Sequence, residues 1–188
     1  MGENKNRKVQ YSNGIILHLD GDKKYSKRAQ NYYNRLNLIS YVENITEKNQ
    51  PREVVYLLEK YKPNILVSTG HDKMLRKGQE LYNINNYKNS KYFIQTVRNA
   101  RIWEPSKEKL IIFAGACESF YEAIMIEGAN FASSPARIMV EYRDPLVIAS
   151  KIAFTPNNEM VKIKDILPYL KSNYKAIGGT VARGQKKT

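Results

Sequence analysis

Cysteine and histidine are scarce in this 188-residue sequence, which contains one cysteine, Cys117, and two histidines, His18 and His71. A single cysteine cannot form a disulfide within the chain, so nothing points to an oxidising compartment. One cysteine and two widely separated histidines also lack the spacing of a zinc site. We therefore expect no metal and no cofactor.

Long apolar runs are missing as well. No stretch approaches the roughly 20 apolar residues that a transmembrane helix needs, and the polar first residues lack the apolar segment of a signal peptide. We expect a cytoplasmic protein with no membrane partner. The hydrophobic content of 42% and charged content of 26% are typical of a globular protein, and the length suits one domain.

Acidic residues are few: 18 Asp and Glu stand against 31 Lys and Arg, which gives a formal net charge of +13. Such a balance favours acidic or polyanionic partners. The basic residues are spread along the whole chain, however, and no nucleic-acid motif is legible. We interpret the charge as a source of solubility and of attraction to acidic partners, and we expect no dedicated nucleic-acid site.

The sequence does contain a regular alternation of short apolar runs with helical segments. Buried strands are expected at residues 14–20, 38–42, 65–67 and 110–113, with further extended segments at 131–134 and 137–140. Helices are expected at residues 23–36, 51–62, 90–103 and 117–127, from Asp144 with this residue as N-cap, and near 164–172. This pattern predicts an α/β fold of three layers, α/β/α, with a mostly parallel sheet of the caspase-like or flavodoxin-like kind.

We expect one domain over residues 11–175, because no repeat or linker divides the chain. Residues 1–10 are expected to be disordered or foreign to the natural protein. Residues 176–188 are rich in Gly and basic residues and are expected to form a carboxy-terminal tail. No part of the pattern sets an oligomeric state.

Cys117 ends one apolar run and His71 ends another. Chemistry in parallel sheets gathers at the carboxyl ends of strands, so these two ends describe a thiol nucleophile and its general base. A helix beginning at Cys117 would direct its positive end at the sulfur and favour the thiolate. The separation, 117 − 71 = 46 residues, accommodates one crossover helix, so the two strands are expected to be consecutive.

Small residues beside this pair suggest an oxyanion hole. The candidate amides are those of Gly70, Gly115, Ala116 and Cys117. Asp72 is a candidate to orient the imidazole, whereas His18 lies between two leucines inside a strand and is expected to be structural. A His followed by a Cys at this separation is the order of caspases, whose Gln-Ala-Cys motif is matched only in Ala116-Cys117. Caspase-like enzymes usually have a Gly after the His, which weakens the assignment of Gly70.

Five longer segments occur in order along the chain: His18–Asp22, Ile65–Asp72, Ser90–Arg98, Ile112–Cys117 and Gly128–Pro135. Together they resemble the YabG family of sporulation-specific proteases, over residues 14–184. The resemblance implies a cysteine peptidase with His71 and Cys117 as the catalytic pair. It also implies spore-coat and cortex-associated proteins as substrates, cleavage after arginine, and a place in the mother cell, in association with the spore coat. Family members usually carry a further amino-terminal region.

Binding an arginine side chain calls for a carboxylate near the catalytic residues. The candidates, in order of preference, are Asp20, Asp22, Glu118 and Asp144. The first two end the first strand at the expected catalytic edge, although Asp22 is equally suited to cap the next helix. Ser133 and Ser134 lie in an extended segment that could pair with the substrate main chain as an added strand, or could serve turn chemistry.

Two interpretations from other classes stay open. A non-catalytic spore-coat scaffold would use its basic surface to bind acidic partners, and its function would survive replacement of Cys117. A small-molecule amidase or transferase would use the same dyad on free amides but not on folded coat proteins. A flavodoxin-like binding domain shares the strand pattern but gives Cys117 no role.

Overall fold

The computed structural model describes residues 13–188, and a six-stranded sheet forms its centre. The strand order is β2-β1-β3-β4-β5-β7, with the first five parallel and the last antiparallel. These strands are β1 (Ile16–Asp20), β2 (Ser40–Asn44), β3 (Ile65–Thr69), β4 (Ile111–Ala114), β5 (Phe131–Ser133) and β7 (Ile177–Gly179). A separate antiparallel pair consists of β6 (Met160–Lys162) and β8 (Val181–Arg183). The segment 1–10, expected to be disordered or foreign, lies outside the described residues.

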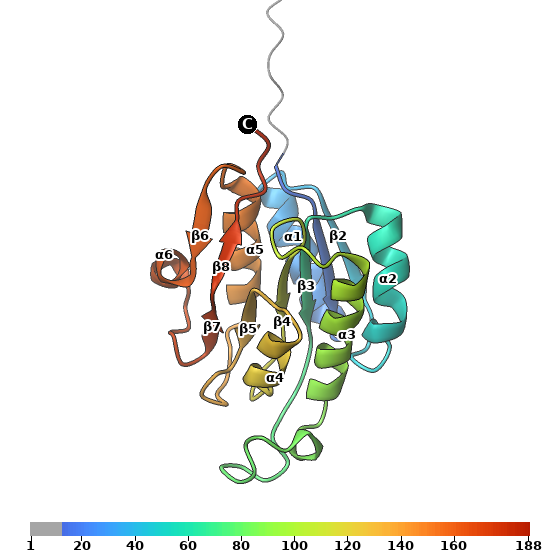
Figure 1. The fold of residues 1–188 in the computed structure, drawn as a ribbon, viewed down its shortest axis with the longest axis vertical. Coiled ribbons are helices and arrows are strands. Elements are labelled where there is room, and N and C mark those ends of the chain that lie inside the picture. Colours follow the sequence, from blue (N-terminus) through green and yellow to red (C-terminus); the bar gives the residue numbers. More distant parts are fainter. Residues whose placement is uncertain (1–12) are drawn as a thin grey trace, which may run out of the picture.

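Helices cover both faces of the sheet (Figure 1). They are α1 (Lys23–Arg35), α2 (Gln50–Tyr61), α3 (Ser90–Trp103), α4 (Tyr121–Ile126), α5 (Asp144–Phe154) and α6 (Ile163–Ile166), with 3₁₀ turns at Ile84–Asn86 and Leu167–Tyr169. One apolar cluster joins α1, α5 and α6 to the sheet, and another joins α2, α3 and α4 to its other face. The expected three-layer α/β/α architecture with a mostly parallel sheet is confirmed.

The strands are apolar on both faces, which is why they appear in the sequence as unbroken apolar runs. In β3, Ile65 and Val67 belong to the α1/α5 cluster, while Leu66 between them belongs to the α2/α3 cluster. Successive side chains of a strand point to opposite faces, so each strand contributes to two cores. Each such side chain stabilises the fold by about 1.5–3 kcal/mol through burial.

The register brings four strand ends to one edge of the sheet. Asp20 of β1 pairs with Thr69 of β3, Ser68 with Ala114 of β4, and Ala114 with Ala132 of β5. The order of the parallel strands reverses between β1 and β3, and a crevice forms outside the carboxyl ends at such a point. The residues that follow β1, β3, β4 and β5 therefore share one crevice.

Two expected elements near this edge differ in the structure: one helix begins later than expected and one strand is missing. The helix expected from Cys117 begins only at Tyr121, because Glu118 has a left-handed backbone (φ 56°) that a helix cannot include. The segment 137–140, expected to be a strand, is irregular because Arg137 also has a left-handed backbone (φ 57°). In addition, the Ser134 hydroxyl accepts a hydrogen bond from the Ile138 amide and donates one to the Ile138 carbonyl, so neither group is available to a neighbouring strand. Both corrections concern loops that shape the crevice.

The carboxy-terminal residues 176–188, expected to be a tail, contribute β7 and β8 to the fold. β7 completes the main sheet by pairing with β5, and β8 pairs with β6. A run of Gly and basic residues signals no core position, so local sequence pattern could not find this role. None of the helices in residues 13–188 is long and apolar enough to cross a membrane.

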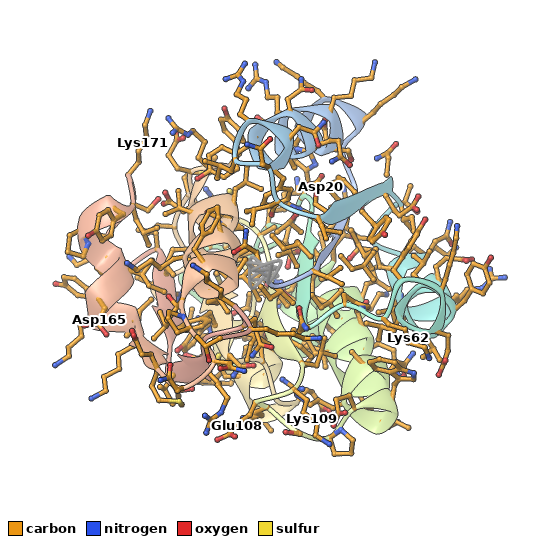
Figure 2. The ribbon with its side chains drawn as sticks, turned by 90° about the horizontal axis from the view of Figure 1, so that it is seen from above. Asp20, Lys62, Glu108, Lys109, Asp165 and Lys171 are labelled. Carbon is orange, nitrogen blue, oxygen red and sulfur yellow. The ribbon has the colours of Figure 1, made fainter. Side chains whose placement is uncertain are left out.

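Helix ends also differ from expectation. Asp144 is the first residue of α5, and Arg143 occupies the cap position. The Asp144 carboxylate is buried and accepts hydrogen bonds from the amides of Lys171 (2.9 Å) and Ser172 (2.8 Å). It therefore anchors a turn that is distant in sequence and does not cap its own helix. Figure 2 shows nitrogen-tipped side chains projecting into solvent along α1.

Candidate active site

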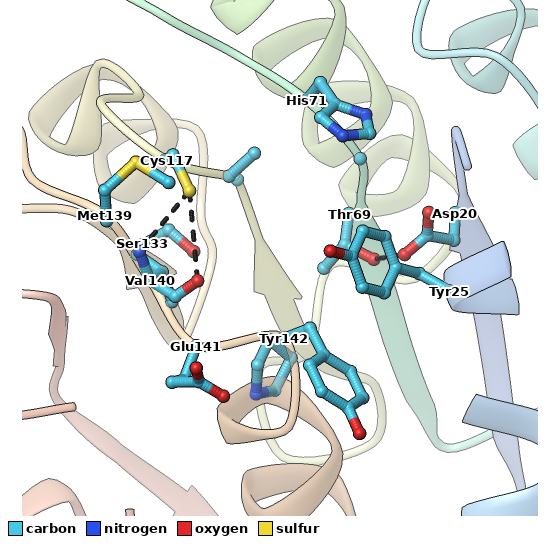
Figure 3. A pocket seen from close by; sticks show the side chains of 14 residues that line it. Asp20, Tyr25, Thr69, His71, Cys117, Ser133, Met139, Val140, Glu141 and Tyr142 are labelled. Carbon is cyan, nitrogen blue, oxygen red and sulfur yellow. Dashed lines mark hydrogen bonds between the residues drawn. The ribbon is translucent and has the colours of Figure 1, made fainter. Parts of the chain in front are cut away.

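A cavity of about 260 Å³ opens at the carboxyl edge of the sheet, and both Cys117 and His71 line it. Cys117 follows β4 and His71 follows β3, and these two strands are hydrogen-bonded neighbours. Figure 3 shows the two side chains on opposite sides of the cavity, and no hydrogen bond joins them in the described structure. The space between them is where a ligand would lie.

Cys117 is half-buried and contacts Val140, which belongs to the segment 139–142 that borders the cavity. The Val140 amide donates to Cys117 Sγ at 3.4 Å, and Sγ lies 3.8 Å from the Val140 carbonyl oxygen (Figure 3). Both contacts are made by backbone atoms, so they fix the sulfur without requiring a particular side chain at position 140.

The turn that carries Cys117 is tied to the end of β3 by Asp72. The Asp72 carboxylate accepts hydrogen bonds from the hydroxyls of Ser119 (2.9 Å) and Ser90. Ser119 Oγ accepts in turn from the Ala116 amide (2.9 Å), and Ser90 Oγ accepts from the Phe120 amide (2.8 Å). Burial raises the pKa of the Asp72 carboxyl, and these donors offset only part of the rise.

This network corrects two expectations. Asp72 does not contact the His71 imidazole, because its carboxylate points toward the cysteine turn. The Ala116 amide is occupied by Ser119, and the Gly115 amide donates to the Ser68 carbonyl at 3.0 Å, so neither is available to an oxyanion. Within residues 13–188, the amides of Gly70 and Cys117 make no hydrogen bond, and both residues line the cavity.

His71 lies between two carboxylates from the loops that follow β1 and β2. Its Nε2 is 4.0 Å from Asp22 Oδ2, and its Nδ1 is 4.0 Å from Glu47 Oε1. The His71 amide donates to the same Glu47 oxygen at 2.7 Å. The imidazole itself is 62% exposed, whereas the Glu47 side chain is only 14% exposed. Glu47 is therefore the fixed partner and His71 the side chain that faces the cavity.

Glu47 was missed by the sequence analysis, and its position explains two glycines. A Cβ on Gly21 would lie 2.2 Å from Glu47 Oε1, and one on Gly70 would lie 2.3 Å from the same oxygen. Any side chain at either position would expel this carboxylate. The available signal was the place of Glu47 shortly after the second strand, which puts it at the same sheet edge as His71.

Asp20 is the predicted carboxylate that does line the cavity. It is buried and accepts from the Asp22 amide and from Thr69 Oγ1, both at 2.7 Å. Burial by itself would raise the pKa of Asp20, but hydrogen bonding and attraction from His18, with the Asp22 and Thr69 donors, outweigh it and lower the pKa. A second carboxylate, Glu141, is exposed at the edge of the cavity and was not expected (Figure 3).

The other predicted residues have different surroundings. Asp22 caps α1 by accepting from the amides of Lys24 and Tyr25, and it also flanks His71. Glu118 points into a separate cavity, where it pairs with Lys77 at 2.8 Å. Ser134 Oγ is held by the backbone of Ile138, as described above. Ser133 lines the active cavity, and its buried hydroxyl has no hydrogen-bond partner among residues 13–188.

His18 has the structural place expected of it. It is buried, with Nδ1 3.1 Å from the Tyr33 hydroxyl and Nε2 2.8 Å from Thr69 Oγ1. Thr69 Oγ1 also donates a hydrogen bond to Asp20, and both Thr69 and Asp20 line the cavity. His18 therefore helps to hold in place two residues of the cavity wall. Among residues 13–188, no group of three or more His, Cys, Asp or Glu side chains is arranged to hold a metal ion.

The architecture and site thus define a three-layer α/β/α protein with a thiol and an imidazole at one crevice. The family described as YabG peptidase U57 matches residues 1–188, and the chain belongs to that family. It is similar to the sporulation-specific protease YabG of Bacillus subtilis (strain 168), with 40% identity over 171 residues. The match covers 91% of this chain and 59% of the relative, so the chain spans less than two thirds of that protein's length.

Proposed function

We propose that the protein is a cysteine endopeptidase of sporulation, with Cys117 as nucleophile and His71 as general base. The observation that carries the proposal is a single cavity that contains this thiol, this imidazole and two unbonded amides. Membership of the YabG peptidase family supports a protease, and the relative's name supports a role in sporulation. We further propose spore-coat and cortex-associated proteins as substrates, met in the mother cell.

The arrangement accounts for each step of amide hydrolysis. His71 accepts the thiol proton, and Cys117 Sγ forms a bond to the scissile carbonyl carbon while the carbonyl oxygen gains negative charge. In this proposal the amides of Gly70 and Cys117, which form no hydrogen bond among residues 13–188, donate to that oxyanion. His71 then gives its proton to the leaving amine, and water releases the acyl group from sulfur. The open gap between the two side chains holds the substrate, and catalytic hydrogen bonds commonly form only in that complex.

Cleavage after arginine is the second part of the proposal. Asp20 and Glu141 line the cavity, and none of its lining residues is Lys or Arg. This is an acidic recess in a chain of net charge +13. The lowered pKa of Asp20 keeps it a carboxylate at neutral pH, so its charge is available to a guanidinium. Because the Asp20 oxygens already accept two hydrogen bonds, they are fixed in place before the substrate arrives.

We expect Asp20→Asn to lower kcat/KM for arginine peptides by about 10- to 100-fold, since a hydrogen bond to a charged group contributes about 1.5–3 kcal/mol. The measurement compares each arginine peptide with its citrulline counterpart, which has the same shape without the charge. The preference for arginine should largely disappear in the variant. Equal losses on both peptides would assign Asp20 a structural role and leave Glu141, tested as Glu141→Gln, as the specificity carboxylate.

The proposed function itself is tested with an arginyl electrophile that labels active-site thiols. Covalent labelling of Cys117, found by peptide mapping and blocked by excess arginine peptide, would support a peptidase with this specificity. Labelling that is equally fast with a neutral electrophile would contradict the arginine preference. If no arginine peptide protects Cys117 from labelling, the result would favour the non-catalytic scaffold.

A further inference from the structure

A second cavity lies beside the active cavity and has the opposite charge. It measures about 290 Å³, and its lining includes Arg28 and Arg35 from α1 and Arg143 at the start of α5. No Asp or Glu is among its lining residues. We call this site the arginine cavity. Arg28 and Arg35 are seven residues apart, which is two helical turns, so they share one face of α1.

The three guanidinium charges of the arginine cavity are not neutralised within the described structure. None of the three forms an ion pair there. Asp144, which follows Arg143, directs its carboxylate to the Lys171 and Ser172 amides instead. α1 contributes five basic residues and no acidic one. Clustered like charges repel each other, so the arginine cavity favours an anion.

Two tyrosine rings separate the arginine cavity from the active cavity. Tyr142 lines both, and it stacks on Tyr25 with ring centroids 5.3 Å apart. The Arg28 guanidinium lies over both rings, 5.7 Å from the Tyr25 centroid and 5.2 Å from that of Tyr142. Figure 3 shows the two rings at one side of the active cavity. A chain passing over this aromatic wall would reach both cavities.

We propose that the arginine cavity binds an acidic side chain of the same polypeptide whose arginine enters the active cavity. This inference rests on the proposed peptidase function and adds a second recognition site to it. An extended chain advances about 3.3–3.6 Å per residue, so the path between the two cavities sets how many positions separate the acidic residue from the arginine, and the test varies this spacing. The substrate would therefore carry a basic and an acidic residue at a fixed spacing.

The charge pattern favours a peptide over nucleic acid. A nucleic acid strand carries a negative charge on every nucleotide, so continuing past the aromatic wall it would meet Asp20 and Glu141. A peptide with one acidic and one basic side chain satisfies both cavities. The arginine cavity is also of a size to hold one side chain rather than a long polyanion.

The test uses two arginine peptides that differ only in Glu or Gln at the spaced position, with kcat/KM measured at low and high salt. We expect the wild-type chain to prefer the Glu peptide by about five- to tenfold, and salt to reduce this preference. In the double variant Arg35→Gln, Arg143→Gln the ratio should fall to about one. The control Lys27→Gln removes a charge from the same helix outside the arginine cavity and should keep the wild-type ratio.

Equal rates on the two peptides at every spacing tested would overturn the inference, as would an equal loss of preference in the Lys27→Gln control. Binding of both peptides to Cys117→Ala, measured by fluorescence anisotropy, tests the inference about the arginine cavity separately from the proposed peptidase activity. A Glu preference in binding that depends on Arg35 and Arg143 supports the arginine cavity even where no peptide is cleaved. Displacement of the acidic peptide by an oligonucleotide at lower concentration than by free acidic peptide would contradict the choice of a peptide.

Discussion

Replacing Cys117 with alanine should abolish cleavage of arginine peptides, with a loss in kcat of about 10⁴-fold or more. In the proposed mechanism the covalent bond to the substrate forms at this sulfur, and the chain contains no second cysteine that could replace it. Steady-state hydrolysis of a fluorogenic arginine peptide measures the loss. The melting temperature should change little, because among the described residues the hydrogen bonds of Sγ are with the Val140 backbone and the thiol is small.

The single cysteine also provides a control without any mutation. Alkylation of the wild-type chain can modify one thiol only, so the loss of activity should parallel the gain of one label per chain. Cys117→Ser keeps the size and the contact with Val140 but has a weaker nucleophile, and it should be nearly as inactive as Cys117→Ala. Full activity in either variant would remove Cys117 from the mechanism, whatever its place in the cavity.

The fold could be predicted because its signals are local. β1, β3 and β4 are buried on both faces, so each appears as an apolar run, and α1 and α3 begin and end within a residue of their expected bounds. The cysteine turn could not be predicted in this way. Its shape depends on Asp72, which is distant in sequence and withdraws Ser119 and the Ala116 amide from a helix. Adjacent-residue patterns contain no trace of that contact.

The candidate site divides along the same line. Cys117, His71 and Asp20 could be placed at one cavity from the sequence, because each lies at or just after the end of a predicted strand and parallel strand ends share an edge. Glu141 and Tyr142 were missed because they lie in an irregular segment that approaches the edge only in the folded chain. Asp144 was misjudged because a carboxylate before a proline resembles a helix cap, while its actual donors are 27 and 28 residues away.

Net charge illustrates what composition leaves out. The excess of 13 positive charges predicts attraction to acidic partners without saying where. In the folded chain the active cavity has only acidic charged groups other than His71, and the arginine cavity beside it has only basic ones. This separation of charge arises because α1 packs against the segment before α5. The number of charged residues in the sequence does not predict that packing.

The second large effect on activity is expected from substitutions of Glu47. We expect Glu47→Gln to lower kcat by about 10- to 100-fold with little change in KM, because partners that orient a functional histidine typically contribute this much. Glutamine retains an oxygen for the His71 amide but loses the charge that lies 4.0 Å from Nδ1. Glu47→Ala should cost more, since it also removes the anchor of the His71 backbone.

The measurement is kcat and KM on the same arginine peptide, beside thermal unfolding of each variant. The matched control is Glu53→Gln on α2, an exposed carboxylate away from the cavity, which should leave both constants unchanged. A positioning role for Glu47 requires kcat to fall while KM and the melting temperature of Glu47→Gln stay near wild type. If kcat falls in proportion to the melting temperature, Glu47 is a packing residue. Gly21 and Gly70 would then leave room for its carboxylate in order to stabilise this edge of the sheet, and not to orient His71.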